Sequence, residues 1–208
     1  MEYERLDRLV FNGKGLDVGG GAQARYLKHL HGDYELDSVN IDSKMEPTYL
    51  LKPGDKFPAR DKSYDFVISL NTLEHIFDPT FVINEVFRVL KDGGIAFIVV
   101  PFIFRIHAHP DDFFRATPSW WFESFSRAGF TGAEIYPLVW GRSITGGSVS
   151  GYSGILPKQI RLHSSALFDI IYARLRSSST KGSDEQFVKR VWAVSQGWFM
   201  EVFKNGDV

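Results

Sequence analysis

The feature that most constrains the fold is a run of three glycines, Gly19 to Gly21, directly after the short segment Lys-Gly-Leu-Asp-Val at residues 14–18. A segment of this kind predicts a buried strand, and residues 22–30 place Ala22, Tyr26, Leu27 and Leu30 on one helical face. The pattern therefore predicts a strand, a tight turn and a helix. Glycine lets the turn approach a ligand because no Cβ intervenes, and the free N–H groups at the start of the helix suit an anionic group.

Strands and helices are expected to alternate along most of the chain. Further strands are predicted at residues 38–42, 48–51, 65–70, 95–100, 131–139 and 197–204. Helices are predicted from Asp78-Pro79 to Gly93-Gly94, from Thr117-Pro118 to Gly129, and over residues 157–176. This alternation implies an open α/β sheet that binds ligands at the carboxyl ends of its strands.

One domain is expected over residues 1–208. Residues 141–154 hold five Gly and four Ser, which predicts a mobile loop. This loop and the helix after it form an expected insertion at about residues 141–183. The insertion carries basic residues at 142, 158, 161, 174 and 176 against Asp169 between 141 and 176. A solvated helix face and a lid over an acceptor both fit this charge, and docking on a membrane surface is the less favoured interpretation.

The composition excludes several classes of protein. The chain has no cysteine, which excludes a disulfide scaffold, cysteine-ligated zinc, an iron–sulfur cluster and thiol catalysis. A net charge of −1 excludes a globally basic nucleic-acid binder. No stretch approaches the roughly 18–20 apolar residues of a membrane span, and residues 1–8 lack an apolar signal region. We therefore expect a cytoplasmic protein without integral membrane contact.

Asp42, at the end of the second expected strand, indicates a nucleoside ligand. An acid there can accept both ribose hydroxyls. The pattern Gly19-x-Gly21-x-x-Ala24 also fits a dinucleotide signature, so an NAD-dependent oxidoreductase is an alternative. Asp17 disfavours a pyrophosphate by like-charge repulsion, and it sits where it could hold an amino group.

The chain resembles the class I S-adenosylmethionine-dependent methyltransferases, in their small single-domain branch. The segments that carry the resemblance are residues 16–21, 40–42, 57–69, 73–76 and 88–94, in that order. The resemblance covers about residues 13–130. It implies a Rossmann-like open sheet of about seven strands, mostly parallel with an antiparallel last strand, with helices on both faces. It also implies S-adenosylmethionine as the cofactor.

The same resemblance implies which residues bind the cofactor. Asp17 and the glycines would surround its methionine part, and Asp42 would bind the ribose. Asp55 lies near the family's adenine-contacting acid, and Leu70 and Asn71 would lie beside the cofactor. Gln23 replaces the family's usual third glycine. The implied set is Asp17, Gly19, Gly20, Gly21, Asp42, Asp55, Leu70 and Asn71.

Residues 105–115 gather two His, two Asp and two Arg behind the strand at 95–100. We predict that His109 or His107 acts as a base, with Asp112 as its orienting partner. We predict that Asp111 and Arg115 bind the acceptor, and pairing of Arg115 with an aspartate is an alternative. A metal held by the histidines and an aspartate, or a purely structural loop, would also fit, and no metal is expected. Glu74 and His75 are expected to orient the short helix after the fourth strand.

Residues 109–118 are similar to a segment of methyltransferases linked to glycan or surface-polysaccharide modification. The predicted function is methyl transfer to a small acceptor, and this resemblance implies a sugar or glycan hydroxyl. A non-catalytic nucleoside-binding module of the same fold is a second alternative. The expected partners are a small-molecule or glycan substrate and no nucleic acid, and the sequence leaves the oligomeric state open.

Overall fold

The computed structural model describes residues 2–107, 111–151, 155, 157–179 and 192–204. The chain divides into two compact units. The first comprises Met1–Val100, Ala108–Tyr136 and Phe199–Val208, and the second comprises Pro101–His107 and Pro137–Trp198. Each unit is described by itself.

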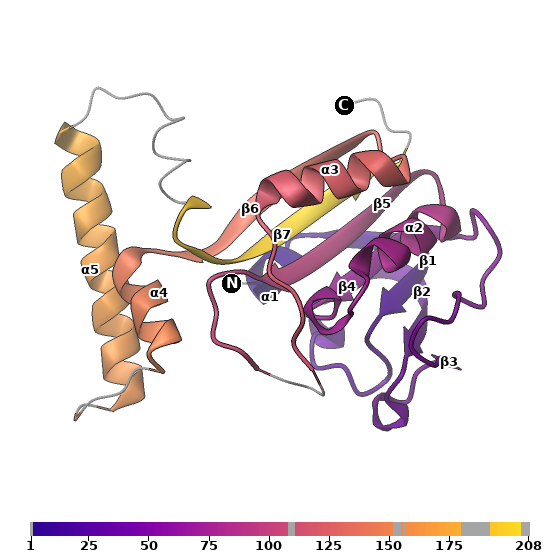
Figure 1. The fold of residues 1–208 in the computed structure, drawn as a ribbon, viewed down its shortest axis with the longest axis horizontal. Coiled ribbons are helices and arrows are strands. Elements are labelled where there is room, and N and C mark those ends of the chain that lie inside the picture. The colour runs from indigo at the N-terminus through magenta and orange to yellow at the C-terminus, as the bar shows by residue number, and fades with distance from the viewer. Residues whose placement is uncertain (1, 108–110, 152–154, 156, 180–191, 205–208) are drawn as a thin grey trace. The chain divides into compact units, whose positions relative to one another are not determined.

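The described residues form one sheet of seven strands in the order β3-β2-β1-β4-β5-β7-β6 (Figure 1). The strands are β1 (Val10–Val18), β2 (His31–Asn40), β3 (Tyr49–Leu50), β4 (Tyr64–Leu70), β5 (Leu90–Pro101), β6 (Gly132–Trp140) and β7 (Ser195–Phe203). The strands from β3 to β5 pair in parallel. Gly93 N donates to Lys204 O and Phe102 N to Gln196 O, both at 2.7 Å, so β7 runs antiparallel to β5. The predicted Rossmann-like sheet is confirmed.

Three α-helices of the first unit are described: α1 (Glu2–Leu6), α2 (Pro79–Val89) and α3 (Pro118–Ala128). Helices α2 and α3 lie side by side over one face of the sheet (Figure 1). Helix α2 begins where the sequence predicts, because the Asp78 carboxylate accepts hydrogen bonds from the amides of Thr80 and Phe81. Helix α3 ends as predicted at Gly129, whose φ of 102° is left-handed. The core centres on β1, β4 and β5, and its least exposed residues include Leu16, Val67, Ile68 and Ile98.

The helix predicted over residues 22–30 is wrong. One 3-10 turn, η1 (Leu27–His29), follows the glycines, and β2 then begins at His31. The amides of Ala22 and Gln23 donate to Glu46 O and Met45 O, at 3.3 Å each, instead of standing free at a helix start. The predicted helix N-terminus for an anionic group is therefore missing from this turn.

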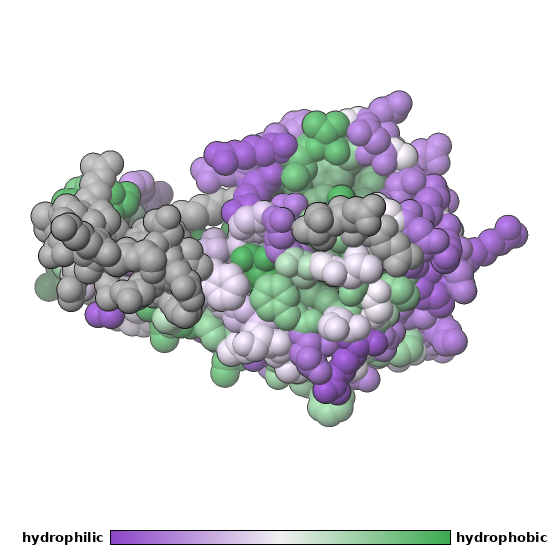
Figure 2. All heavy atoms as spheres, turned by 90° about the horizontal axis from the view of Figure 1, so that it is seen from above, coloured by the Kyte–Doolittle hydropathy of each residue, from purple (hydrophilic) through white to green (hydrophobic). Residues whose placement is uncertain are grey.

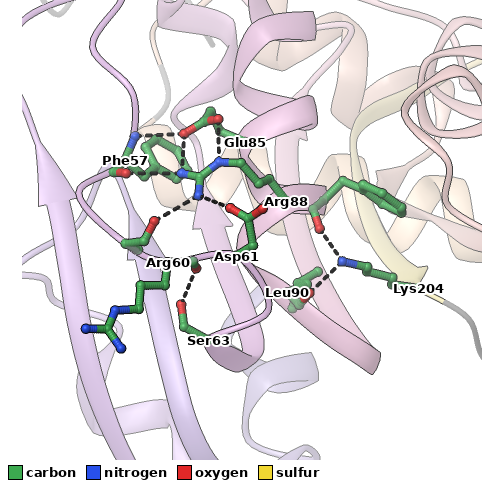
Figure 3. A network of polar contacts seen from close by, with 10 residues as sticks. Phe57, Arg60, Asp61, Ser63, Glu85, Arg88, Leu90 and Lys204 are labelled. Carbon is green, nitrogen blue, oxygen red and sulfur yellow. Dashed lines mark hydrogen bonds and ion pairs between the residues drawn. The ribbon is translucent and has the colours of Figure 1, made fainter.

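The prediction that Gly93-Gly94 ends helix α2 is also wrong. The helix ends at Val89, and both glycines lie within β5. The last carbonyls of α2 find other partners: Arg88 O accepts from Lys62 N and Val89 O from Ser63 N. The buried Lys204 ammonium donates to Phe87 O at 2.7 Å and to Leu90 O at 2.6 Å (Figure 3). Since these groups satisfy the helix end, no glycine cap is needed there.

A polar network fixes the other side of α2. Glu85 accepts two hydrogen bonds from Arg88 and one from the Phe57 amide, and Arg88 also donates to Asp61 and to two loop carbonyls (Figure 3). The network ties residues 57–61 to the helix. It holds the segment between β3 and β4 in place.

The second unit contains α4 (Arg142–Val149) and α5 (Lys158–Ser179). Helix α5 confirms the helix predicted at residues 157–176, whereas residues 142–149 are helical where a loop is predicted. The reason is a cap supplied from α5. The buried Asp169 carboxylate accepts from Ser143 N at 3.0 Å and from Ile144 N at 2.8 Å. It thereby satisfies amides at the start of α4, where Gly141 has no side chain to do so. None of the described helices is long and apolar enough to cross a membrane.

Candidate functional site

The three glycines form a tight turn at the carboxyl end of β1. Gly19 has a φ of 91°, and a Cβ there would lie 2.1 Å from Thr72 Oγ1, just beyond β4. A Cβ on Gly20 would lie 1.8 Å from Asp17 Oδ2 and 2.1 Å from the Tyr26 hydroxyl. The turn therefore has no room for a side chain at either position. It is held between the end of β4 and the side chain of Asp17.

Asp17 is fully buried at the base of this turn. The Tyr26 hydroxyl lies 2.7 Å from both carboxylate oxygens, and the Gly21 amide also donates to the carboxylate. Burial raises the pKa of Asp17 to about 7, against the lowering effect of these two donors. Burial, and then the neighbouring Asp17, raise the pKa of Tyr26. The charge beneath the glycines therefore changes near neutral pH.

Asn40, the last residue of β2, joins the glycine turn to Asp42. Its Nδ2 donates to Gly19 O at 2.6 Å and to Gly20 O at 3.0 Å. Its Oδ1 accepts from the Asp42 amide at 2.9 Å. One side chain thus fixes the predicted ribose-binding acid beside the predicted methionine-binding turn.

Asp42 lies two residues beyond β2 and is half-buried. Its Oδ1 accepts from Lys44 N at 2.9 Å, which starts the 3-10 turn η2 (Ser43–Met45). Gln23 Nε2 donates to Glu46 Oε2 at 3.0 Å. The residue that replaces the family's third glycine therefore links the turn after β1 to the turn after β2.

The other predicted cofactor residues lie at nearby strand ends. Leu70 is buried as the last residue of β4. Asn71 follows it with a φ of 53°, and its backbone N–H donates to Val99 O. Asp55 is exposed, and its carboxylate accepts from Lys52 N at 2.8 Å. In the described part of the chain, the hydrogen bonds of Asp55 stay within its own turn. The hydrogen bonds bring Asp17, the glycines and Asp42 together and leave Asp55 outside this group.

The predicted acceptor segment is attached to the 3-10 turn η3 (Leu73–His75), which follows β4. Phe113 N donates to Glu74 O at 2.8 Å, and His75 Nδ1 donates to Asp111 O at 2.5 Å. The buried side chain of Asp112 accepts two hydrogen bonds from Arg115, at 2.5 and 2.6 Å. This is the Arg–Asp pairing that the sequence leaves open as an alternative. Asp111 is exposed.

The structure describes one of the two predicted histidine bases. His107 belongs to the second unit, where its ring lies 5.4 Å from that of Phe104. His109 lies outside the described residues. The catalytic roles of both histidines therefore stay predictions.

Sequence reasoning missed two residues of this site, Tyr26 and Asn40. The sequence predicts Tyr26 on the face of a helix that does not form, and this prediction hides its contact with Asp17. A signal for Asn40 exists, since an amide side chain at the end of a strand and two residues before an acid can bond to both neighbouring turns.

Residues 16–98 match a family model described as a methyltransferase domain. The chain is 31% identical over 97 residues to an uncharacterized protein of Methanocaldococcus jannaschii, which covers 45% of this chain and 47% of that protein. The chain thus spans about half the length of this curated relative.

Two solved structures show the same fold. One is a methyltransferase in complex with the Trm112 methyltransferase activator of Haloferax volcanii, with a TM-score of 0.61, 18% identity, and coverage of 99% of this chain and 89% of that chain. The other is phosphoethanolamine N-methyltransferase 2 of Haemonchus contortus with phosphomonomethylethanolamine and S-adenosylhomocysteine, with a TM-score of 0.57, 14% identity, and coverage of 98% and 51%. The family match bears out the predicted methyltransferase domain over residues 16–98, and the two solved structures share its fold.

Proposed function

We propose that the protein transfers the methyl group of S-adenosylmethionine to a small acceptor, and that the accepting atom is a sugar or glycan hydroxyl. The observation that carries the methyl-transfer proposal is that hydrogen bonds join the glycine turn after β1 to Asp42 after β2. Asp17 lies under the glycine turn, and Asn40 binds both that turn and the backbone of Asp42.

The donor set fits this cofactor. Asp17, whose pKa burial raises to about 7, lies beneath a turn without side chains, and the half-buried Asp42 follows the end of the neighbouring strand β2. Asp42 would accept the ribose hydroxyls, and Asp17, when ionised, would attract the positively charged methionine part. A pyrophosphate would meet two carboxylates here, which disfavours NAD. When bound, S-adenosylmethionine supplies a methyl group already activated by its sulfonium. The chain then needs to align the acceptor and exclude water.

The acceptor proposal rests on residues 105–118. His109 or His107 would take the hydroxyl proton, since a neutral imidazole nitrogen can act as a general base. Asp111 is exposed and available to a sugar hydroxyl. The bidentate pair of Asp112 with Arg115 supports a role for both residues in shaping this segment, and Arg115 would contact the acceptor from within the pair.

Isothermal titration calorimetry with S-adenosylhomocysteine and with NAD tests the cofactor. We expect binding of the first and none of the second, and the reverse result would refute methyl transfer. Transfer of radiolabelled methyl groups to candidate glycans then tests the acceptor, with His109→Ala expected to abolish it. Binding of S-adenosylhomocysteine without transfer to any acceptor would favour a non-catalytic module.

A further inference from the structure

Helix α5 carries an apolar face that the second unit, taken by itself, leaves uncovered. The inner face of the helix is marked by Asp169, which is buried and caps α4. Ile160, Leu167 and Ile171 share one face of the helix because they are seven and four residues apart. This face lies opposite Asp169, because the three residues stand nine before, two before and two after it in the sequence, each about half a turn away around the helix. The exposed fractions of Ile160 and Leu167 are 53% and 58%. Two further apolar residues, Phe168 and Ile170, flank this face, and their exposed fractions are 62% and 48%.

The charge of the second unit differs from that of the whole chain. Its sequence holds nine lysine and arginine residues against three aspartate and glutamate residues, whereas the whole chain has 24 against 25. Among the side chains that the structure describes in this unit, the one acidic residue is Asp169, which is buried. Lys158 and Arg142 are exposed. The described surface of the unit is therefore both cationic and apolar. Figure 2, which is coloured by hydropathy, shows hydrophilic and hydrophobic residues side by side over the described part of this unit.

We propose that helix α5 binds the surface of an anionic lipid bilayer. A helix with an apolar face and basic residues beside it lies in the plane of the membrane interface, with the apolar side chains among the acyl chains. Anionic headgroups attract each nearby lysine or arginine. The described helices cannot cross a membrane, so α5 would lie on the bilayer and not span it.

The charge argues against other occupants of this face. A second copy of the same unit would bring two cationic surfaces together, which like-charge repulsion disfavours. Nucleic acid would use the basic residues but would leave the apolar face exposed to water. The lipid surface satisfies both properties at once, and the inference does not depend on the methyltransferase activity.

Co-sedimentation of the full chain with vesicles tests the proposal. We expect binding to vesicles of phosphatidylcholine mixed with phosphatidylglycerol, weaker binding to phosphatidylcholine alone, and weakening by salt. The double variant Leu167→Gln/Phe168→Gln should bind about tenfold more weakly, because it removes two apolar side chains from the interface. Lys158→Gln, a surface change that leaves the apolar face intact, should weaken binding to the anionic vesicles about fivefold.

Phe122→Gln is the matched control, because Phe122 is an exposed phenylalanine of α3 in the first unit. This variant should bind vesicles as the unchanged protein does. Absence of binding to anionic vesicles, or equal binding by the α5 variants and the control, would overturn the proposal. A dimer in analytical ultracentrifugation that the double variant abolishes, without vesicle binding, would assign the face to a second copy instead.

Discussion

Removal of the Tyr26 hydroxyl should make the stability of this protein depend more steeply on alkaline pH. In the variant Tyr26→Phe, the fully buried Asp17 carboxylate loses the hydroxyl that lies 2.7 Å from both of its oxygens. A hydrogen bond to a charged group contributes roughly 1.5–3 kcal/mol. Since 1.36 kcal/mol corresponds to one pKa unit, the loss should move the Asp17 pKa upward by about one to two.

The direction of the pH effect follows from proton linkage. The folded-state pKa of Asp17 is about 7, above its ordinary value of 3.8, so the folded protein binds the extra proton between these two values. The contribution of Asp17 to stability is therefore fully present below pH 3.8 and declines until the pH passes about 7. In Tyr26→Phe this decline continues to a higher pH. The free energy of unfolding of the variant should fall further below that of the unchanged protein, by about 1.5–3 kcal/mol between pH 6 and 9.

Urea denaturation of both proteins at several pH values from 6 to 9 measures this difference. Tyr34→Phe is the matched control, because the Tyr34 hydroxyl donates to the Leu30 carbonyl at 3.3 Å and not to a carboxylate. Its effect on the free energy of unfolding should be the same at every pH. A Tyr26→Phe effect that is equally constant would refute the link between this hydroxyl and the charge of Asp17.

Three further variants test other parts of the structure. Gly20→Ala should abolish S-adenosylhomocysteine binding and lower the melting temperature, because its Cβ would lie 1.8 Å from Asp17 Oδ2. The control Gly146→Ala, whose Cβ would meet open space, should change neither the binding nor the melting temperature. Calorimetry and thermal scans measure the two quantities, and tight binding by Gly20→Ala would contradict the geometry of the turn. Asp42→Ala should weaken S-adenosylhomocysteine binding by roughly 1–3 kcal/mol through lost charge-assisted hydrogen bonds; unchanged affinity in calorimetry would mean that the ribose binds elsewhere. Asp169→Ala should lower the free energy of unfolding by about 1–2 kcal/mol, since it uncaps α4. Urea denaturation followed by circular dichroism measures this free energy, and a value equal to that of the unchanged protein would refute the role of the cap.

The central strands were predictable because their signal is local. The apolar runs of β4 and β5 are buried on both faces, and such runs predict interior parallel strands from the sequence alone. The start of α2 was equally clear, since Asp78 caps the helix from within the same segment. The glycine turn and Asp42 were found for the same reason, because each directly follows a recognisable strand.

The errors arose where the deciding partner lies far away in the sequence. Residues 22–30 have helical periodicity, yet their first amides are taken by Met45 and Glu46, more than twenty residues later. Residues 142–149 contain two glycines and predict a loop, but Asp169 caps them as a helix from 25 residues away. Tyr26 is another example, because it contacts Asp17 from the irregular segment that stands where the sequence predicts a helix. Pattern reading weighs neighbours along the chain and cannot weigh such remote bonds.

The strand order has a consequence for how the chain is made. Strand β7 is inserted between β5 and β6, although both of these are synthesised before it. While the ribosome is still adding the residues between β6 and β7, the nascent chain therefore has two strands whose inner edges lack a partner. Open edges of this kind attract other chains. The sheet is complete only once β7 has entered this gap, so a delay in that entry would prolong the exposure of both edges and favour aggregation.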